Sequence, residues 1–454
     1  MNNLVLFEEN QRLREENQKL SVRIFQLEEQ LNTNSRNSSK SPSQDPFRQS
    51  RQSPPSGRKQ GGQPGHPGHS RKMLPLDSVT MIMEIKPDHC PHCGISAFEI
   101  EPIAIQYRQV VELSTPSPAV TQYNVYTCRC SKCGKKVKAQ VPQEAQSSFG
   151  PRLKAFLTML AGEAHVTKRK IHTVMRHLGI EVSLGSICNA HRLASALLQK
   201  SCIDIRSAVL QSSNVNADES SWRFKSLRHW LWIGATSMAT FFCIDPSRSR
   251  VAFQTIFHGF RNTLTSDRYG AYNLYPGSRQ ACLAHIRRDF IKVSQRPNAD
   301  GAIGRILCDQ LDAIFAHWKQ FKTGTLSRSD LQQQSQEMIE NIKLALIIGS
   351  AGDKISSRTA ALCHDLLDRF DTLWTFLSEE NVEPTNNLAE RNLRPAVIYR
   401  KLTGGSQSKW GMEFVERLLT VVCTCRQQGK NVFTFLTDIF HAHNCNGPAP
   451  PIFA

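Results

Sequence analysis

From residue 213 the chain changes from the three-to-four-residue spacing of apolar side chains that is typical of helices to the two-residue alternation of β-strands. The predicted strands lie at 214–224, 229–234, 240–245, 262–267 and 280–285, and a predicted helix occupies 250–260. The first three strands follow one another closely, which predicts an antiparallel meander. A second helical region fills 300–380. We therefore expect an α+β protein built around one sheet.

Three carboxylates occupy defined places on these elements. Asp218 lies on the first strand, Asp267 ends the fourth strand, and Glu390 starts a helix after the second helical region. If the first and fourth strands are neighbours and the late helix packs across them, the three acids meet at one point. Such a set can hold two Mg²⁺ ions, which prefer oxygen ligands and share phosphate oxygens. Two ions about 3.5–4 Å apart promote in-line displacement at a phosphodiester.

The segment 383–395, which carries Glu390, is strongly cationic. Arg391 and Arg394 follow the glutamate closely and would hold phosphates while the carboxylate holds the cation between them. Two simpler interpretations remain open. Asn387 and Glu390 also fit a capping box, and Glu390 and Arg394 fit an ordinary i,i+4 pair.

The length, net charge and cysteine content of the chain indicate its size class, its partner and its compartment. The 454 residues are enough for two or three domains, and the net charge of +17 favours a polyanionic partner, first of all nucleic acid. Most of the 14 cysteines stand singly in apolar segments, as reduced thiols of an intracellular protein do. With no signal peptide and no membrane-spanning apolar run, we expect a cytoplasmic protein without a membrane partner.

The N-terminal segment carries a heptad repeat. Leucines recur every seventh residue, with asparagines three residues before three of them: Leu6, Leu13, Leu20 and Leu27, with Asn3, Asn10 and Asn17. This pattern predicts a parallel coiled coil, and so a homodimer or a higher oligomer. Residues 32–72 are basic and nearly free of apolar side chains, which predicts disorder. This segment is either a tether that lies along DNA phosphates or a plain linker.

Two Cys-x-x-Cys-Gly motifs follow, at Cys90–Cys93 and Cys130–Cys133. Four thiolates at this spacing predict a zinc ribbon that holds a structural Zn²⁺. Cys128 is an alternative to Cys130 as the third ligand.

The next segment predicts helices that begin at Pro151, after Thr167 and after Ser183. The last two, joined around Gly179, have the form of a helix-turn-helix, although many helical pairs simply pack together. The candidates for contact with a DNA groove are Ser186, Asn189, His191 and Arg192.

Taken together, these motifs resemble the transposases of the bacterial IS66 insertion-sequence family over nearly the whole chain. The matching blocks are 34–43, 90–133, 217–220, 266–272, 282–288 and 386–395. The resemblance implies a DDE transposase with a ribonuclease-H-like fold, in which Asp218, Asp267 and Glu390 bind Mg²⁺ or Mn²⁺, two ions per active site. It also implies a structural or DNA-positioning role for His285, and we assign DNA contacts to Arg287, Arg288, Arg391 and Arg394.

The resemblance further implies what the protein acts on. It would bind the terminal inverted repeats of its element, cut there, and join the freed 3′-OH to target DNA, with accessory proteins of the same element as further candidate partners. We expect it at the bacterial nucleoid. The alternatives are a catalytically inactive, transposase-derived, sequence-specific DNA-binding protein, and a nuclease without strand transfer.

The sequence thus predicts a multidomain α+β protein. Its parts are a coiled coil (1–31), a basic linker (32–72), a zinc ribbon (73–145), a helical DNA-binding region (146–205), a ribonuclease-H-like α/β catalytic domain (206–296 and 381–410), an all-helical insertion (297–380) and a C-terminal helical segment (411–454).

Overall fold

The computed structural model describes residues 2–31, 33, 73–83, 92, 108–110, 118–129, 131–133 and 135–453. The chain divides into two units, Met1–Pro46 with Val120–Ala454, and Phe47–Ala119. The predicted linker, except for residue 33, lies outside the described residues, and so do the predicted zinc ligands Cys90, Cys93 and Cys130. None of the helices in the described part of the chain combines the length and hydropathy that a bilayer span requires.

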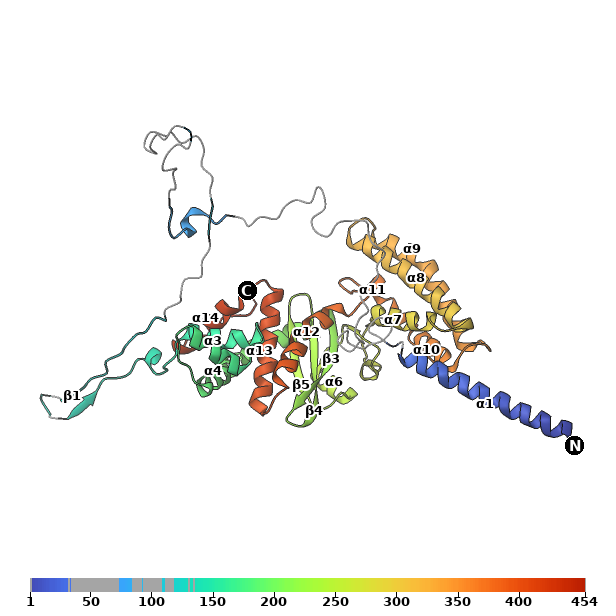
Figure 1. Ribbon diagram of the computed structural model, residues 1–454. Helices are drawn as coiled ribbons and strands as arrows, with labels where there is room; N and C mark the ends of the chain where they lie inside the picture. The colour runs from blue at the N-terminus through green and yellow to red at the C-terminus, as the bar shows by residue number, and fades with distance from the viewer. Residues whose placement is uncertain are drawn as a thin grey trace. The chain divides into compact units, whose positions relative to one another are not determined.

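A five-stranded mixed sheet lies at the centre of the folded region (Figure 1). Its strands are hydrogen-bonded in the order β5–β4–β3–β6–β7. The strands are β3 (Asn214–Phe224), β4 (Leu227–Ala235), β5 (Thr240–Asp245), β6 (Thr263–Ser266) and β7 (Arg279–Ala281). The first three form an antiparallel meander, while β6 runs parallel to both β3 and β7. The predicted meander is confirmed, and the first and fourth strands are neighbours, which was the condition for the acids to approach one another.

The predicted fifth strand is wrong in its second half. The strand ends at Ala281, and helix α7 (Leu283–Ser294) begins two residues later. The predicted helix after the meander is shorter than expected, because α6 covers only Arg250–Ile256.

Along the chain, helices both precede and follow the strands of the sheet. Those before it are α2 (Pro151–Gly162), α3 (Lys168–His177), α4 (Leu184–Leu197) and α5 (Gln199–Gln211). Those after α7 are α8 (Asn298–Lys322), α9 (Arg328–Ala351), α10 (Ser357–Leu367), α11 (Thr375–Ser378), α12 (Asn387–Thr403), α13 (Lys409–Gln427) and α14 (Val432–Asn444). The region 297–380 is helical, as predicted.

Two hydrophobic cores hold these elements. One joins strands β3 to β6 to helices α2–α6 and α12–α14 through large side chains such as Trp232, Phe260 and Phe440. The other joins helix α7 to the helices of 297–380 through Phe290 and Phe376. Burial of these apolar surfaces, worth roughly 25 cal/mol per Å² of apolar area, is the main force that holds the sheet and its helices together.

Helix α13 covers the outer edge of strand β5. The side-chain oxygens of Thr424, Thr420 and Glu416 accept hydrogen bonds from the backbone N–H groups of Thr240, Phe242 and Ile244, respectively. The spacings match, because two residues along a strand advance about 6.6 Å and four residues along a helix about 6.0 Å. The edge is therefore paired and cannot serve as a template for another strand.

We predict that Glu416 makes stability depend on pH. Burial raises the pKa of Glu416 to about 7 from an ordinary 4.5. The folded state therefore binds the proton more tightly, and stability that is present below pH 4.5 is lost as the pH rises through 7. Glu416→Gln should raise the free energy of unfolding at pH 8 by up to about 3 kcal/mol, as measured by urea denaturation. At pH 4.5 the same substitution should change the free energy of unfolding very little.

The control is Glu337→Gln, which removes an exposed carboxylate on α9, away from Glu416. This variant should keep the pH dependence of the wild type. Equal pH profiles for Glu416→Gln and the wild type would contradict the prediction.

Candidate active site

The parallel pairing of β3 with β6 brings Asp218 beside Asp267. The paired residues are Asn214 with Thr263, Val215 with Leu264, and Asn216 with Thr265. Continued by two residues, this register sets Asp218 opposite Asp267, at the carboxyl end of β6. The electrostatics agree, because burial and the negative charges of Glu219, Asp267 and Glu390 raise the pKa of Asp218 well above its ordinary range. The backbone N–H of Glu219, which donates to Asp218 at 2.8 Å, acts in the opposite direction.

Asn386 ties the start of helix α12 to the sheet. This buried side chain donates to the carbonyl of Ala217 at 2.8 Å and accepts from the amide of Asn216 at 3.1 Å. Its backbone N–H donates to the sulfur of Cys282 at 3.1 Å. Its carbonyl accepts the N–H of Glu390 at 3.2 Å. The glutamate therefore sits one helical turn beyond a residue that is fixed to β3.

Among the described residues, Glu390 forms neither a capping box with Asn387 nor an i,i+4 ion pair with Arg394. Asn386, not Asn387, occupies the N-cap position of α12, and no side chain caps the helix. Oε1 of Glu390 is buried and has no hydrogen-bond partner among the described residues. Its charged neighbours within 4 Å lie on α7, and Arg394 is not one of them.

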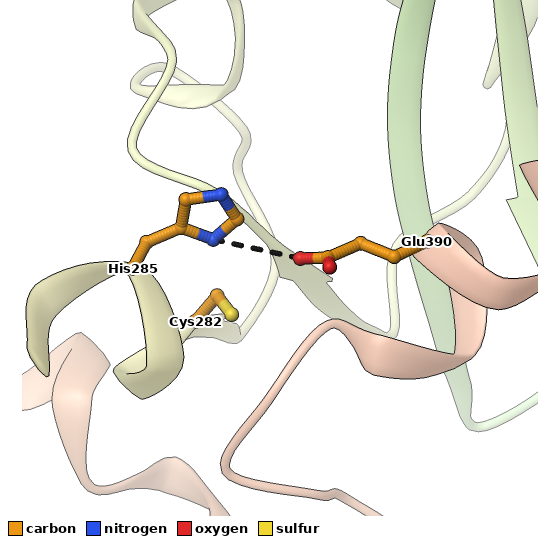
Figure 2. Close-up of side chains that lie close together, drawn as sticks. All are labelled: Cys282, His285 and Glu390. Atoms are coloured by element: carbon orange, nitrogen blue, oxygen red, sulfur yellow. Dashed lines mark ion pairs between the residues drawn. The ribbon is translucent and has the colours of Figure 1, made fainter. Parts of the chain in front are cut away.

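Glu390 and His285 point toward one another from helices α12 and α7 (Figure 2). Nδ1 of His285 lies 3.7 Å from Oε1 of Glu390, and Nη2 of Arg288 lies 3.9 Å from the same oxygen. Cys282 lies beside both, and one ligand atom from each of Cys282, His285 and Glu390 falls within 4.8 Å of the others. These three residues form a compact cluster at the start of α7.

Protonation in this cluster follows from burial. Burial and the positive charge of Arg288 lower the pKa of His285, against the opposing effect of Glu390. Burial raises the pKa of Cys282 to about 11, although the N–H groups of Asn386 and His285 partly offset it. At neutral pH Cys282 is therefore a thiol, which is a poor metal ligand unless the metal itself displaces the proton.

A second buried carboxylate, Glu219, was missed by the sequence analysis. It adjoins Asp218 on β3 and so faces the opposite side of the sheet. It accepts hydrogen bonds from the hydroxyl of Tyr272 and, at 2.7 Å, from Nε of Arg248. Burial and the charge of Asp267 raise the pKa of Glu219, while these two hydrogen bonds lower it. The signal was present, since Glu219 and Tyr272 both fall in the blocks that resemble the family.

Arg248 also fixes the loop that follows β6. Its guanidinium lies 3.7 Å from the ring centroid of Tyr269, and its carbonyl accepts the hydroxyl of Tyr269 at 2.8 Å. The N–H of Tyr269 donates to Oδ1 of Asp267 at 2.9 Å. Arg279 on β7 donates to the carbonyl of Asp267 at 2.7 Å. Asp267 is thus held by its neighbours through one carboxylate oxygen and its carbonyl.

The predicted DNA contacts fall into two groups. Arg288 and His285 flank Glu390, whereas Arg287 pairs with Asp312 of α8 at 2.7 Å and so already has a counter-charge. The other two arginines, at 391 and 394, are exposed on α12 and form no ion pair within the described part of the chain. Arg391 also lines a cleft of about 1050 Å³ that extends to Trp318 and Phe321 of α8.

Two further predictions concern residues outside this site. His191 cannot face a DNA groove, because it is fully buried, with Nε2 3.1 Å from the carbonyl of Leu157 and its ring stacked on Phe414. Of the predicted zinc ligands, Cys133 and the alternative Cys128 are described. Both are exposed, at the short antiparallel pair β1 (Thr127–Arg129) and β2 (Lys136–Lys138).

Comparison with known proteins gives the family. A model of the family described as "Transposase IS66 family" matches residues 146–414, which include the sheet, the acidic residues and the helical insertion. The chain therefore belongs to the IS66 transposase family. Residues 3–72 match a second family, which is of unknown function (DUF6444).

Two uncharacterized proteins of Sinorhizobium fredii (strain NBRC 101917 / NGR234) are also similar to the chain. One, y4qI, is 23% identical over 296 residues, which cover 58% of this chain and 51% of that protein. The other, y4hP, is 21% identical over 348 residues, which cover 69% of this chain and 63% of that protein. The chain thus spans between half and two thirds of the length of these relatives.

We predict that two adjacent asparagines differ sharply in importance. Asn386→Ala removes two side-chain hydrogen bonds and leaves the buried carbonyl of Ala217 unpaired, so the free energy of unfolding should fall by about 2 kcal/mol in urea denaturation. Asn387→Ala is the matched control, because that side chain is exposed on the same helix. Equal losses in the two variants would contradict the anchoring role of Asn386.

Proposed function

We propose that the chain is a DDE transposase that binds the ends of its element, cleaves the DNA there and transfers the freed 3′-OH to target DNA. The observation that carries the proposal is the register of β3 with β6, which sets Asp218 opposite Asp267, while Asn386 fixes the start of α12, and so Glu390, to β3. The electrostatics support it, because Glu219, Asp267 and Glu390 add to burial in raising the pKa of Asp218. Membership of the IS66 transposase family supports the same class of activity.

We assign the sheet to the ribonuclease-H-like class. The assignment is supported by the parallel pairing of the first and fourth strands and by helix α12, which packs across β3 and β4. The helical segment between α7 and α12 then corresponds to the insertion that precedes the glutamate.

The three acids offer the oxygen ligands that divalent cations prefer, although the ligand group that already lies within 4.8 Å in the described part of the chain is Cys282, His285 and Glu390. Burial and the neighbouring negative charges raise the pKa of Asp218, and a bound cation would offset both effects. Oε1 of Glu390, buried and without a hydrogen bond among the described residues, has capacity for a further partner. Asp218, Asp267 and Glu390 would hold two Mg²⁺ or Mn²⁺ ions. When bound, such ions activate the attacking oxygen and stabilise the leaving oxygen.

The protein's own residues would position the reactants. Asn386 holds the start of α12, and so Glu390, against β3. Arg391 and Arg394 adjoin the glutamate on an exposed part of the same helix, where guanidinium groups can bind phosphates in bidentate fashion. Water, and later the 3′-OH, would attack the phosphodiester directly. Because the carboxylates act as ligands, no covalent link between protein and DNA is formed.

The cysteines would have a structural role. Cys90, Cys93 and Cys133, with Cys130 or Cys128, would hold one Zn²⁺ in a ribbon that supports DNA binding. The helical region before the sheet and the basic segment 32–72 would add further contacts to the DNA backbone.

Asp267→Ala tests the catalytic assignment. We expect cleavage of DNA that carries the element ends to fall by at least about a thousandfold in Mg²⁺, because the variant loses one carboxylate of the acidic cluster. Binding to the same DNA should persist. Asp204→Ala, which removes an exposed carboxylate paired with Lys200 on α5, should leave cleavage unchanged.

The same assay separates the alternatives. If the wild-type protein binds the ends but never nicks them, it is a DNA-binding protein only. If it nicks DNA but joins no 3′ end to a target, it is a nuclease. Full cleavage by Asp267→Ala would refute the site.

We also propose that the N-terminal helix α1 (Asn2–Leu31) forms a parallel coiled-coil dimer. The helix is continuous over four heptads. Its core-position leucines Leu13, Leu20 and Leu27 are 47%, 55% and 43% exposed in the single chain. A row of half-exposed leucines at seven-residue spacing is the surface that a second helix covers.

Replacing two of these leucines should dissociate the dimer. In the double variant Leu13→Lys and Leu20→Lys, charges fall in the coiled-coil core, so the mass measured by light scattering should drop from dimer to monomer. Glu15→Lys changes charge on the outer side of the same helix and should leave the mass unchanged. A dimer that survives the double variant would show that α1 does not hold it together.

A further inference from the structure

A second cavity, of about 370 Å³, lies outside the acidic site. It is formed by the segment that leads into α2, one face of α4 and the end of α14. Its polar lining includes Ser147, Ser148, Lys154, Ser186, Asn189 and His443. Of the lining residues within the described part of the chain, none is acidic.

Lys154 is the unusual member of this lining. Its side chain belongs to the buried set, with the residue only 7% exposed. Its ammonium has no hydrogen bond and no ion pair among the described residues. Burial alone lowers the pKa of Lys154, with no carboxylate acting against it. Lysines are rarely buried unless they are paired, because an unpaired buried charge is strongly destabilising.

Two helix N-termini add positive potential at the same cavity. Helix α2 starts directly after the lining segment, and its N-cap, Gly150, has no side chain to accept from the first N–H groups. Helix α4 contributes Ser186 from its first turn, where the capping hydroxyl of Ser183 accepts the N–H of Ser186 and pairs with its hydroxyl. The N-terminus of a helix carries a partial positive charge, and N–H groups that no side chain caps can donate to an anion. Lys154 and the uncapped start of α2 therefore favour an anion, to which the dipole of α4 adds.

We propose that this cavity binds a phosphate group of the DNA backbone, with Lys154 as its counter-charge and with the hydroxyl of Ser186 and the amide of Asn189 as hydrogen-bond donors. The choice of DNA rests on the proposed function, whereas the anion site itself follows from the cavity. Such a contact fixes the position of the duplex and reads no bases. It also gives a role to Ser186 and Asn189, two of the four residues that the sequence marks as facing DNA.

The proposal implies that Lys154 lowers the stability of the fold and strengthens the binding of phosphate. Lys154→Met keeps the length of the side chain and removes the ammonium charge of this largely buried residue. Without phosphate this variant should be more stable than the wild type, and it should no longer respond to phosphate. A lysine retained only for packing would give no such paired effect.

The first test uses the full-length protein and inorganic phosphate. Thermal unfolding is followed in chloride and in phosphate at equal ionic strength. Phosphate should raise the melting temperature of the wild type by a few degrees. It should do so equally for Lys354→Met, which removes an exposed charge from the loop before α10, and not for Lys154→Met.

Asn189→Asp provides a second variant in case Lys154→Met does not fold. Asn189 is exposed at the cavity, so the change is tolerable there, and the new carboxylate should repel phosphate. Equal phosphate responses in the wild type, Lys154→Met and Asn189→Asp would overturn the anion site.

The second test measures affinity for a short random-sequence duplex as a function of salt. Loss of one phosphate contact should lower the affinity of Lys154→Met about tenfold and reduce the slope of log K against log salt by about 1. Lys354→Met should match the wild type. A lost phosphate response with an unchanged DNA slope would assign the cavity to free phosphate and overturn the DNA assignment. If the wild type binds DNA through Lys154 but never cleaves it, the catalytic proposal fails and this site stands.

Discussion

The parallel pairing of β3 with β6 is the interaction on which the rest of the site depends. It joins segments about 50 residues apart and sets two aspartates opposite each other. Because side chains alternate across a strand, a slip of one residue would turn Asp218 to the other face and bring Glu219 in its place. The register is held by what lies on both faces: Asn386 binds the strand from one side, and Tyr272 and Arg248 bind Glu219 on the other.

Asp218 and Glu219 are adjacent on β3, but their surroundings differ. Glu219 is buried, and both a hydroxyl and a guanidinium donate to it, so its charge has partners within the fold. Asp218 receives one backbone N–H, and the negative charges of Asp267 and Glu390 act on it in addition to that of Glu219. Its charge therefore has fewer partners within the fold than that of Glu219. Repulsion of this kind is retained where something outside the chain can relieve it, and a divalent cation is the simplest such partner.

The sequence was sufficient for the antiparallel meander and for the helical character of 297–380, because these depend on local periodicity. The pairing of the first and fourth strands was a condition taken from the ribonuclease-H-like fold and not from a local pattern. The sequence was not sufficient for Asn386 or Arg248, because their partners lie about 170 and 29 residues away and no local pattern marks them. His191 was misassigned for a related reason. Its place on α4 suited a recognition helix, but tertiary packing against Phe414 from α13 decided its orientation. The end of β7 was missed because Cys282 starts a helix where apolar residues continue.

The chain has a net charge of +17, but the candidate site is acidic. A polyanion that reaches the site therefore has to approach carboxylates. Coulomb repulsion between the carboxylates and a phosphodiester is short-ranged at physiological salt, where the Debye length is about 8 Å. Positive groups close to the acids therefore matter more than the total charge. Arg391 follows Glu390 directly, and Arg288 lies 3.9 Å from it. The cavity at Lys154 belongs to a different part of the fold, next to α2 and α4. If it binds a backbone phosphate as proposed, it would hold the duplex and would not offset the acids. Attraction over the surface and neutralisation at the site would then be separate tasks, performed by separate residues.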